Sequence, residues 1–294
     1  MTHSVRTSDG AELAVRDSGG DRDTTVLLLH GWTNDHTVWD RVSELLAPHA
    51  RVLRYDHRGH GRSTPGPRGS ATLERAAEDL AEVITSQVPT GRLVLVGHSM
   101  GAMTMMALAE LRPDLVAGRV NGAVFVSTSS GGLREETFGL PAPLVRLARR
   151  RRRPQRGGPS TGSRRTPKRP NAVRRLGSLI GVRWVAFGQS PARQDVRAAA
   201  AQLAAAHKGS LAGFQHAMNR HERTGALAGY GSVPTAVLVG QRDRLTPVRH
   251  ARVIAAELPR GEFVLYHRAG HMLPYERATE VAARIVSTIR RSTV

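Results

Sequence analysis

Short apolar runs alternate with helix-spaced stretches along most of this chain of 294 residues, and this alternation is what most constrains its fold. The runs are rich in Val and Leu and are bounded by Gly, Asp or Ser, which is typical of strands buried on both faces of a sheet. Strands that alternate with helices form right-handed crossovers and a mostly parallel sheet. The expected strands are 24–31, 50–56, 92–99, 121–129, 234–243 and 262–271, with an antiparallel edge strand at 11–19. The pattern predicts an α/β fold whose central sheet is flanked by helices.

Apolar side chains recur at helical spacing between these runs. The stretch 36–49 places Val38, Trp39, Val42, Leu45 and Leu46 on one stripe, and 71–88 does the same with Leu73, Ala77, Leu80, Val83 and Ile84. Further helices are expected after Ser99, Pro247 and Pro274. In an open sheet of this kind, functional residues gather at the carboxyl ends of the strands, so the loops there carry the candidate chemistry.

The sequence Gly97-His98-Ser99-Met100-Gly101 lies between an expected strand and an expected helix. This is G-x-S-x-G in the strand, turn and helix context of a nucleophile elbow. Small residues two positions before and after the serine let the strand and the helix approach while the turn holds the serine in a strained conformation. We therefore predict Ser99 as a nucleophile and the Met100 N–H as a donor beside it. The alternative is a glycine-rich turn with a chance serine.

A serine hydroxyl is a poor nucleophile unless a base takes its proton. Among the 13 His residues, His271 is the best candidate, because it follows the last expected strand and precedes a helix that Pro274 would begin. Asp243 ends the preceding strand and would fix the tautomer of the imidazole. The alternatives are a structural histidine and an aspartate that caps a turn. The chain order Ser, Asp, His, each at the end of a different strand, favours a catalytic triad.

A second backbone donor is needed for a developing oxyanion. His30-Gly31-Trp32 directly follows the first apolar run, and the Trp32 N–H would supply this donor if it turned inward. The alternative is a strand-ending turn with a core tryptophan.

Taken together, these motifs resemble the α/β-hydrolase-fold enzymes, in the serine-nucleophile branch that includes esterases, lipases and haloperoxidases. The resemblance extends over about residues 20–290 and rests on the segments 30–32, 55–63, 97–101, 240–243 and 269–271. It implies Ser99 as nucleophile, His271 as base, Asp243 as its partner, and Trp32 and Met100 as oxyanion donors. It also implies that Asp56, Arg58 and His60 shape a turn near the site. The serine at the elbow disfavours the members that use an aspartate nucleophile.

The same resemblance implies a cap at 130–230, inserted into a core made of 1–129 and 231–294. Helical spacing is readable at 173–188 and 195–221. Five apolar side chains in these helices are candidates to line an acyl pocket, with ordinary packing as the alternative. They are Leu179, Trp184, Phe187, Phe214 and Met218.

The net charge of +19 is concentrated in one part of this cap. Residues 137–194 contain 14 Arg, one Lys and no acidic residue, which accounts for +15. Like charges mixed with Pro, Gly, Ser and Thr predict disorder around 146–175. A solvated loop is the first interpretation, and an anionic membrane surface is the alternative partner. Because no aromatic residue interrupts the Arg run, nucleic acid is a less favoured partner.

The chain has no Cys, which excludes disulfides, thiolate metal sites and thiol nucleophiles. No metal or organic cofactor is implied. The first residues contain no signal-peptide pattern and no long apolar run, so a cytoplasmic location is expected, with peripheral attachment to a membrane as the alternative.

The expected activity is hydrolysis of a carboxylic ester with an apolar acyl group through an acyl-enzyme. Three alternatives use the same residues: a cofactor-free perhydrolase of the haloperoxidase type, a lipase for monoacylglycerols or lysophospholipids, and a carbon–carbon bond hydrolase in which cap Arg residues hold a carboxylate. A non-catalytic binding protein on the same scaffold is disfavoured by the intact Ser, Asp and His.

Overall fold

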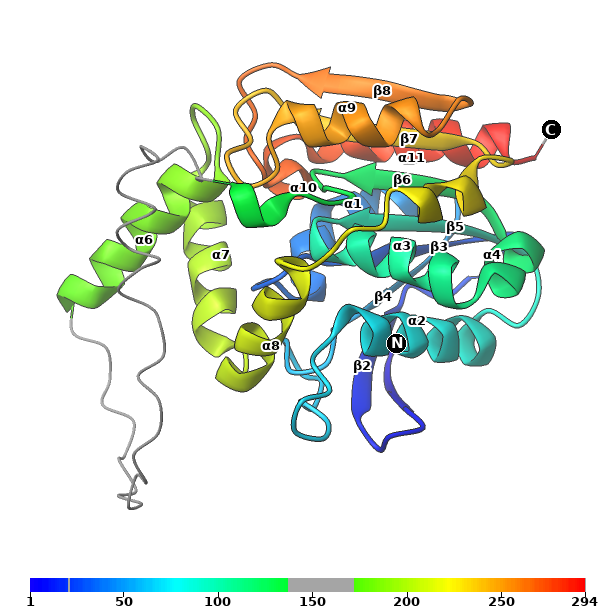
Figure 1. Ribbon diagram of the computed structural model, residues 1–294, viewed down its shortest axis with the longest axis horizontal. Coiled ribbons are helices and arrows are strands. Elements are labelled where there is room, and N and C mark those ends of the chain that lie inside the picture. The colour runs from blue at the N-terminus through cyan, green and yellow to red at the C-terminus, as the bar shows by residue number, and fades with distance from the viewer. Residues whose placement is uncertain (21, 137–171, 294) are drawn as a thin grey trace.

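The computed structural model describes residues 1–20, 22–136 and 172–293. In this part of the chain, eight strands form one sheet in the order β1-β2-β4-β3-β5-β6-β7-β8 (Figure 1). The strands are β1 (Thr2–Arg6), β2 (Glu12–Asp17), β3 (Thr24–Leu29), β4 (Arg51–Tyr55), β5 (Arg92–His98), β6 (Val120–Val126), β7 (Thr235–Gly240) and β8 (Gly261–Tyr266). All neighbouring pairs from β4 to β8 are parallel, so the predicted α/β fold class is confirmed.

The antiparallel edge of the sheet differs from the prediction. β2 lies within the expected segment 11–19, but it pairs with β4 on one side and with β1 on the other, so β1 is the edge strand. Only Val5 of β1 is buried. An edge strand with one buried side chain has no apolar run, which is why the sequence pattern does not indicate it.

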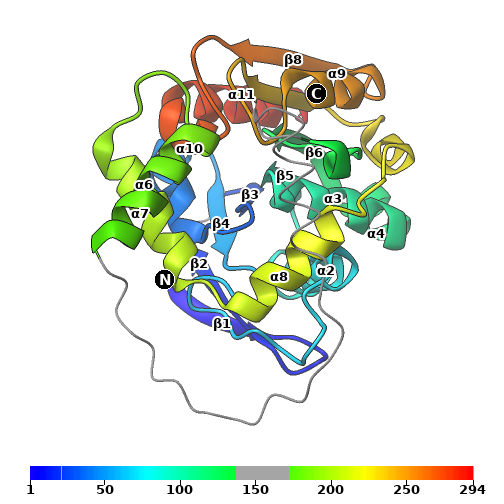
Figure 2. The same cartoon turned by 60° about the vertical axis from the view of Figure 1, so that its left-hand side comes forward.

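Helices cover both faces of the sheet (Figures 1 and 2). Alternate strand residues point to opposite faces, so Leu27 and Leu29 join one apolar cluster while Val26 and Leu28 join the other. The first cluster includes side chains of α2 (Leu73–Gln87), α3 (Met100–Leu111), α4 (Pro113–Arg119) and α9 (Val248–Ala256). The second includes side chains of α1 (Asp40–Leu46), α10 (Leu273–Glu276) and α11 (Ala278–Arg291).

The two predicted helical stripes are found with one exception. The stretch 36–49 forms a short 3₁₀ helix, η1 (His36–Trp39), and then α1, and Leu45 is 41% exposed instead of buried. All five predicted residues of α2 are buried, and the Thr72 side chain caps its start by accepting a hydrogen bond from the Arg75 N–H at 3.1 Å.

Between β6 and β7 the chain forms a group of helices beyond the carboxyl ends of the strands (Figure 1). They are η2 (Leu133–Glu135), α6 (Ala172–Ala186), α7 (Arg193–Ala205) and α8 (Lys208–Met218). The last helix before β7, η3 (Gly225–Tyr230), lies instead against α3 and α4. We call α6, α7 and α8 the inserted helices. The single helix predicted at 195–221 is instead two, because the His207 N–H donates to the Gly59 carbonyl at 2.8 Å and its ring accepts from the Ser210 N–H, which starts α8.

The predicted disorder around 146–175 falls largely on residues outside those described. Its last residues, 172–175, form the start of α6. Within the described part of the chain, no helix combines the length and the apolar character needed to cross a membrane.

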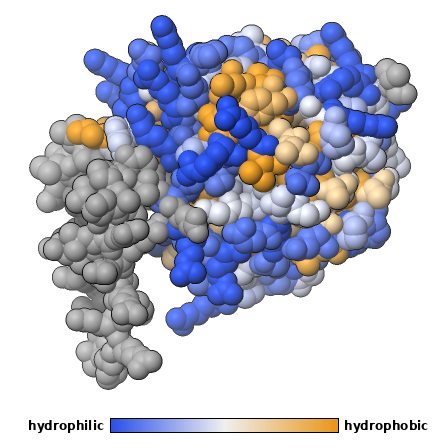
Figure 3. Space-filling model, turned by 45° about the horizontal axis from the view of Figure 1, so that its top comes forward, coloured by the Kyte–Doolittle hydropathy of each residue, from blue (hydrophilic) through white to orange (hydrophobic). Residues whose placement is uncertain are grey.

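The surface seen in Figure 3 is mostly hydrophilic, with an apolar area in the middle of the view. Large apolar side chains that are exposed in the structure include Val253 of α9 and Phe263 of β8, the strand at the other edge of the sheet. Neither residue lines the cavity described below.

The segment 55–63 forms a buried polar turn beside the carboxyl end of β4. Asp56 accepts hydrogen bonds from the His36 N–H and the His36 ring. The fully buried guanidinium of Arg58 pairs with Asp79 at 2.7 Å and with Asp9 at 2.8 Å. These contacts favour the structural role that the resemblance implies for the segment.

Replacing Arg58 tests that role. We expect Arg58→Met to lower the free energy of unfolding by about 3–5 kcal/mol, because it leaves the buried carboxylate of Asp79 without its guanidinium partner. Arg75→Met is the matched control, since Arg75 pairs with the same Asp79 but is partly exposed, and we expect a loss of about 1 kcal/mol or less. Urea unfolding at neutral pH measures both values, and equal losses would contradict the prediction.

The loss of stability in Arg58→Met should depend on pH in a defined direction. Hydrogen bonds from Arg58 hold the pKa of Asp9 well below its usual range. A carboxyl group whose pKa is lowered by folding stabilises the protein above its unfolded pKa of about 3.9, and this stabilisation is lost as the pH falls. The difference in stability between the wild type and Arg58→Met should therefore shrink progressively as the pH falls below about 4, and it should vanish only below the lowered pKa of folded Asp9.

Candidate active site

Ser99 lies on the sharp turn between β5 and α3 with φ 51° and ψ −115°. A Cβ on Gly97 would lie 2.4 Å from the Ala102 nitrogen, and one on Gly101 would lie 2.5 Å from the Leu29 carbonyl oxygen. The Ser99 N–H donates to the Val126 carbonyl at 2.9 Å. Glycine is thus required on both sides, and the turn holds Ser99 in a conformation that costs about 1–3 kcal/mol.

His271 and Asp243 form a buried pair at the same edge of the sheet, with 2.9 Å between Nδ1 and Oδ2. Thr246 completes the pair, since its hydroxyl donates to Asp243 Oδ2 at 2.9 Å and its N–H donates to Oδ1 at 2.8 Å. Burial raises the pKa of Asp243, but His271 and the bonds from Thr246 outweigh it and hold the pKa below the usual value. An ionised Asp243 favours a proton on Nδ1, which leaves Nε2 of His271 as an acceptor.

His98 connects the Ser99 turn to the His271 loop. Its Nε2–H donates to the His271 carbonyl at 3.0 Å. Burial, together with the neighbouring His271, lowers the pKa of His98 to about 3, so the ring stays neutral near physiological pH. Neither His98 nor Thr246 was predicted to have a role, although His98 occupies the variable position before the serine in the G-x-S-x-G motif.

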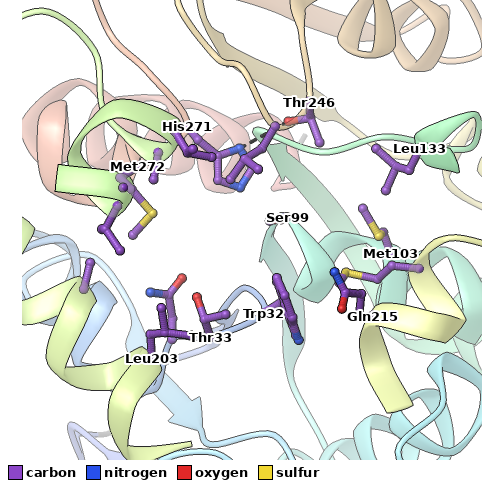
Figure 4. Close-up of a pocket in the computed structure, with 18 of the residues that line it drawn as sticks. Trp32, Thr33, Ser99, Met103, Leu133, Leu203, Gln215, Thr246, His271 and Met272 are labelled. Atoms are coloured by element: carbon purple, nitrogen blue, oxygen red, sulfur yellow. Dashed lines mark hydrogen bonds between the residues drawn. The ribbon is translucent and has the colours of Figure 1, made fainter. Parts of the chain in front are cut away.

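Ser99 and His271 line one cavity of about 450 Å³ together with Trp32 (Figure 4). Figure 4 shows Ser99 between His271 and Trp32, and most of the residues that line the cavity come from the inserted helices and from loops at the carboxyl ends of the strands. The apolar side chains of its wall include Met103, Leu133, Val182, Val185, Leu203, Met218, Leu245 and Met272, and its amides are Asn34, Gln215 and Asn219.

Of the five residues predicted to line an acyl pocket, Met218 lies in the wall of this cavity. The other four do not, and the prediction for them is corrected. Phe187 and Phe214 are fully buried in the core, and Leu179 packs against it. Trp184 is 39% exposed and lies under the Arg244 guanidinium. Helical spacing identifies an apolar face, but it does not tell which face of an inserted helix meets the cavity.

The backbone N–H groups of Trp32 and Met100 were predicted as oxyanion donors. Within residues 1–20, 22–136 and 172–293, neither donates a hydrogen bond to the protein. Met100 is the first residue of α3, so its N–H lies at the positive end of a helix next to Ser99. A Cβ on Gly31 would lie 3.2 Å from the Ser99 Cβ, which places the turn that carries Trp32 against the serine.

A second polar cluster lies near the site. Asp35, His36 and Asp56 bring three ligand-type atoms within 4.8 Å of one another. The protein itself satisfies them, because His36 Nδ1 is 2.8 Å from Asp56 Oδ1 and Asp35 accepts from the Thr37 N–H at the start of η1. We interpret the cluster as structural.

An open, mostly parallel sheet that carries a strained serine on a strand-to-helix turn and a buried His–Asp pair at one carboxyl edge has the architecture of hydrolytic α/β enzymes. Comparison with known proteins agrees. A family model described as the alpha/beta hydrolase fold matches residues 24–278, and the chain therefore belongs to that family.

Individual known proteins are similar to this chain over all or part of its length. A thermophilic esterase from Thermogutta terrifontis aligns over 100% of both chains, with a TM-score of 0.75 and 27% identity. A pimeloyl-[acyl-carrier protein] methyl ester esterase from Sodalis glossinidius is 39% identical over 104 residues, which cover 35% of this chain and 37% of that protein. A Mycobacterium tuberculosis protein described as a probable oxidoreductase, EphD, is 36% identical over 104 residues, or 35% of this chain and 18% of the relative. The chain thus spans less than half the length of these two curated relatives.

Proposed function

We propose that this protein is a serine hydrolase that cleaves a neutral carboxylic ester through an acyl-enzyme. The observation that carries the proposal is the His271–Asp243 pair, 2.9 Å apart, behind a cavity whose wall also contains Ser99. The esterase relatives agree in chemistry. In this proposal the inserted helices act as a cap over the site.

The mechanism follows from the protonation states. His271 Nε2 takes the proton from the Ser99 hydroxyl, and the Ser99 oxygen attacks the ester carbonyl. The N–H groups of Trp32 and Met100 stabilise the resulting oxyanion, and each such donor is worth about 10²–10³ in rate. His271 then protonates the leaving alcohol, and in the second half of the reaction it activates a water that releases the acid. Ionised Asp243 stabilises the imidazolium in both halves.

The wall of the cavity favours an uncharged substrate. Among the described residues that line it, there is no Asp, Glu, Lys or Arg, although the chain as a whole carries a charge of +19. Burying a carboxylate without a partner is costly, so this wall suits an apolar acyl group. The carbon–carbon bond hydrolase alternative needs an Arg to hold a carboxylate, and the described lining offers none.

A pair of substrates tests this selectivity. We expect kcat/KM for mono-p-nitrophenyl adipate to be about 10² lower than for p-nitrophenyl hexanoate, because the adipate buries a carboxylate that the wall leaves unpaired. The p-nitrophenyl ester of monomethyl adipate is the control, since it has the polar end without the charge and should be hydrolysed nearly as well as the hexanoate. Equal turnover of the adipate would contradict a neutral acyl site.

The proposed function itself is tested by hydrolysis of p-nitrophenyl esters of increasing chain length, combined with labelling by a fluorophosphonate. We expect turnover of at least one ester and one covalent label, located on Ser99 by peptide mass spectrometry. A protein that neither hydrolyses any ester nor takes the label would overturn the proposal. Activity with acetate and peroxide in the same assay would distinguish a perhydrolase, the alternative, from an esterase.

A further inference from the structure

The segment that carries the Trp32 N–H is a strained turn. The Asn34 N–H donates to the Gly31 carbonyl at 3.2 Å, and Thr33, at the third position of the turn, has φ 72°. A positive φ at this position is normal for glycine in a type II turn but costly for a β-branched residue. Such a turn needs contacts from outside to hold its conformation. The same contacts therefore fix the direction of the Trp32 N–H.

Two inserted helices supply those contacts. The Trp32 indole N–H donates to the Leu211 carbonyl of α8 at 3.1 Å. The Asn34 side chain donates to the Gln202 amide oxygen of α7 at 2.9 Å. Both ends of the turn are thus tied to helices that are about 170 residues away in the sequence.

Gln202 also has hydrogen-bond partners beyond the turn. Its amide nitrogen lies 2.7 Å from Thr37 Oγ1, 3.1 Å from Asp35 Oδ1 and 3.1 Å from the Tyr275 hydroxyl. Gln202 is 8% exposed, so water competes little for these bonds. Tyr275 belongs to α10, which begins two residues after His271.

We infer that Gln202 is a positioning residue for ester hydrolysis: through Asn34 it fixes the turn whose Trp32 N–H receives the oxyanion. This inference rests on the proposed function. Gln202 does not line the cavity. Replacing Gln202 should therefore weaken stabilisation of the transition state and leave ground-state binding of the ester nearly unchanged.

The test is Gln202→Met, which keeps the length of the side chain and removes its hydrogen bonds. We expect kcat for the best p-nitrophenyl ester to fall about 10- to 100-fold while KM changes less than about threefold. The Ki of a trifluoromethyl ketone, which forms the tetrahedral oxyanion, should rise by the same factor as kcat falls. The Ki of the corresponding amide, which resembles the ground state, should stay within about twofold. Gln194→Met is the matched control, because Gln194 lies exposed on the same helix.

A double-mutant cycle identifies the route. If Gln202 acts through Asn34, Asn34→Ala combined with Gln202→Met should cost no more in kcat than the more damaging single change. Gln202→Leu, which also removes the acceptor for Asn34, serves as the second variant if Gln202→Met does not fold. It should show the same split between kcat and KM.

The outcomes are distinguishable. Ester turnover that depends on Ser99, together with unchanged kcat in Gln202→Met, overturns this inference alone. A rise in KM with kcat intact, or a lower melting temperature without any change in the ketone Ki, overturns it as well, because either result shows only a binding or a structural role. Absence of Ser99-dependent turnover in the wild type overturns the proposed function and this inference together.

Discussion

Ser99→Ala is expected to lose about 10⁴–10⁶ of the kcat for ester hydrolysis, because no other hydroxyl replaces the nucleophile on the turn. The remaining activity would come from substrate binding and the two N–H donors. Steady-state kinetics with the best p-nitrophenyl ester measures the loss, and the fluorophosphonate label should disappear in parallel.

The Ser99 turn also provides the control for this variant. Alanine meets the same strain at φ 51° as serine, so Ser99→Ala should retain the melting temperature of the wild type. Ser99→Gly should be equally inactive and more stable, by about 1 kcal/mol, because glycine adopts a positive φ at little cost. An active Ser99→Ala protein, within about tenfold of the wild type, would refute the assigned nucleophile.

Asp243→Asn is expected to lower kcat by about 10⁴ while KM stays within a few-fold. The neutral amide no longer stabilises the imidazolium, and its NH₂ group can face Nδ1 and leave the proton on Nε2, where the base must accept one. Kinetics between pH 6 and about pH 9 measure the loss, and a partial return of activity at high pH would agree with the tautomer argument.

Thr246→Val is the comparison for that variant. Valine keeps the volume of threonine but removes the hydroxyl that donates to Asp243 Oδ2 at 2.9 Å, while the N–H bond to Oδ1 remains. A loss of about tenfold is expected, far smaller than for Asp243→Asn. If both variants lost the same activity, Asp243 would act only as a structural partner of its own turn.

The parallel sheet could be predicted from the sequence because buried strands leave a local trace. The central strands contain apolar runs such as Val26–Leu29 of β3, which is buried at all six positions. β1 left no such trace, since its pairing with β2 is a property of the assembled sheet. The break at His207 was invisible for a similar reason, because a bond to Gly59, far away in the chain, sets it.

The residues of the candidate site could likewise be predicted only in part. Ser99, Asp243 and His271 could be found because each sits in a short motif at a strand end, where local backbone geometry dictates the residue type. The wall of the cavity could not, since Met103, Leu133 and Leu203 contribute to it only through the relative placement of three elements. Gln202 gave no signal at all, because all of its partners lie outside its own helix.

The amide of Gln202 contacts residues from the first 40 positions and from the last 20 at once. A chimera that takes α7 from a relative would therefore lose hydrogen bonds to residues near both ends of the sequence. It would keep them only if the segment 34–37 and Tyr275 were transplanted with α7. Recombination of the insertion between family members should succeed where these three pieces are inherited together, which makes them a single module despite their separation along the gene.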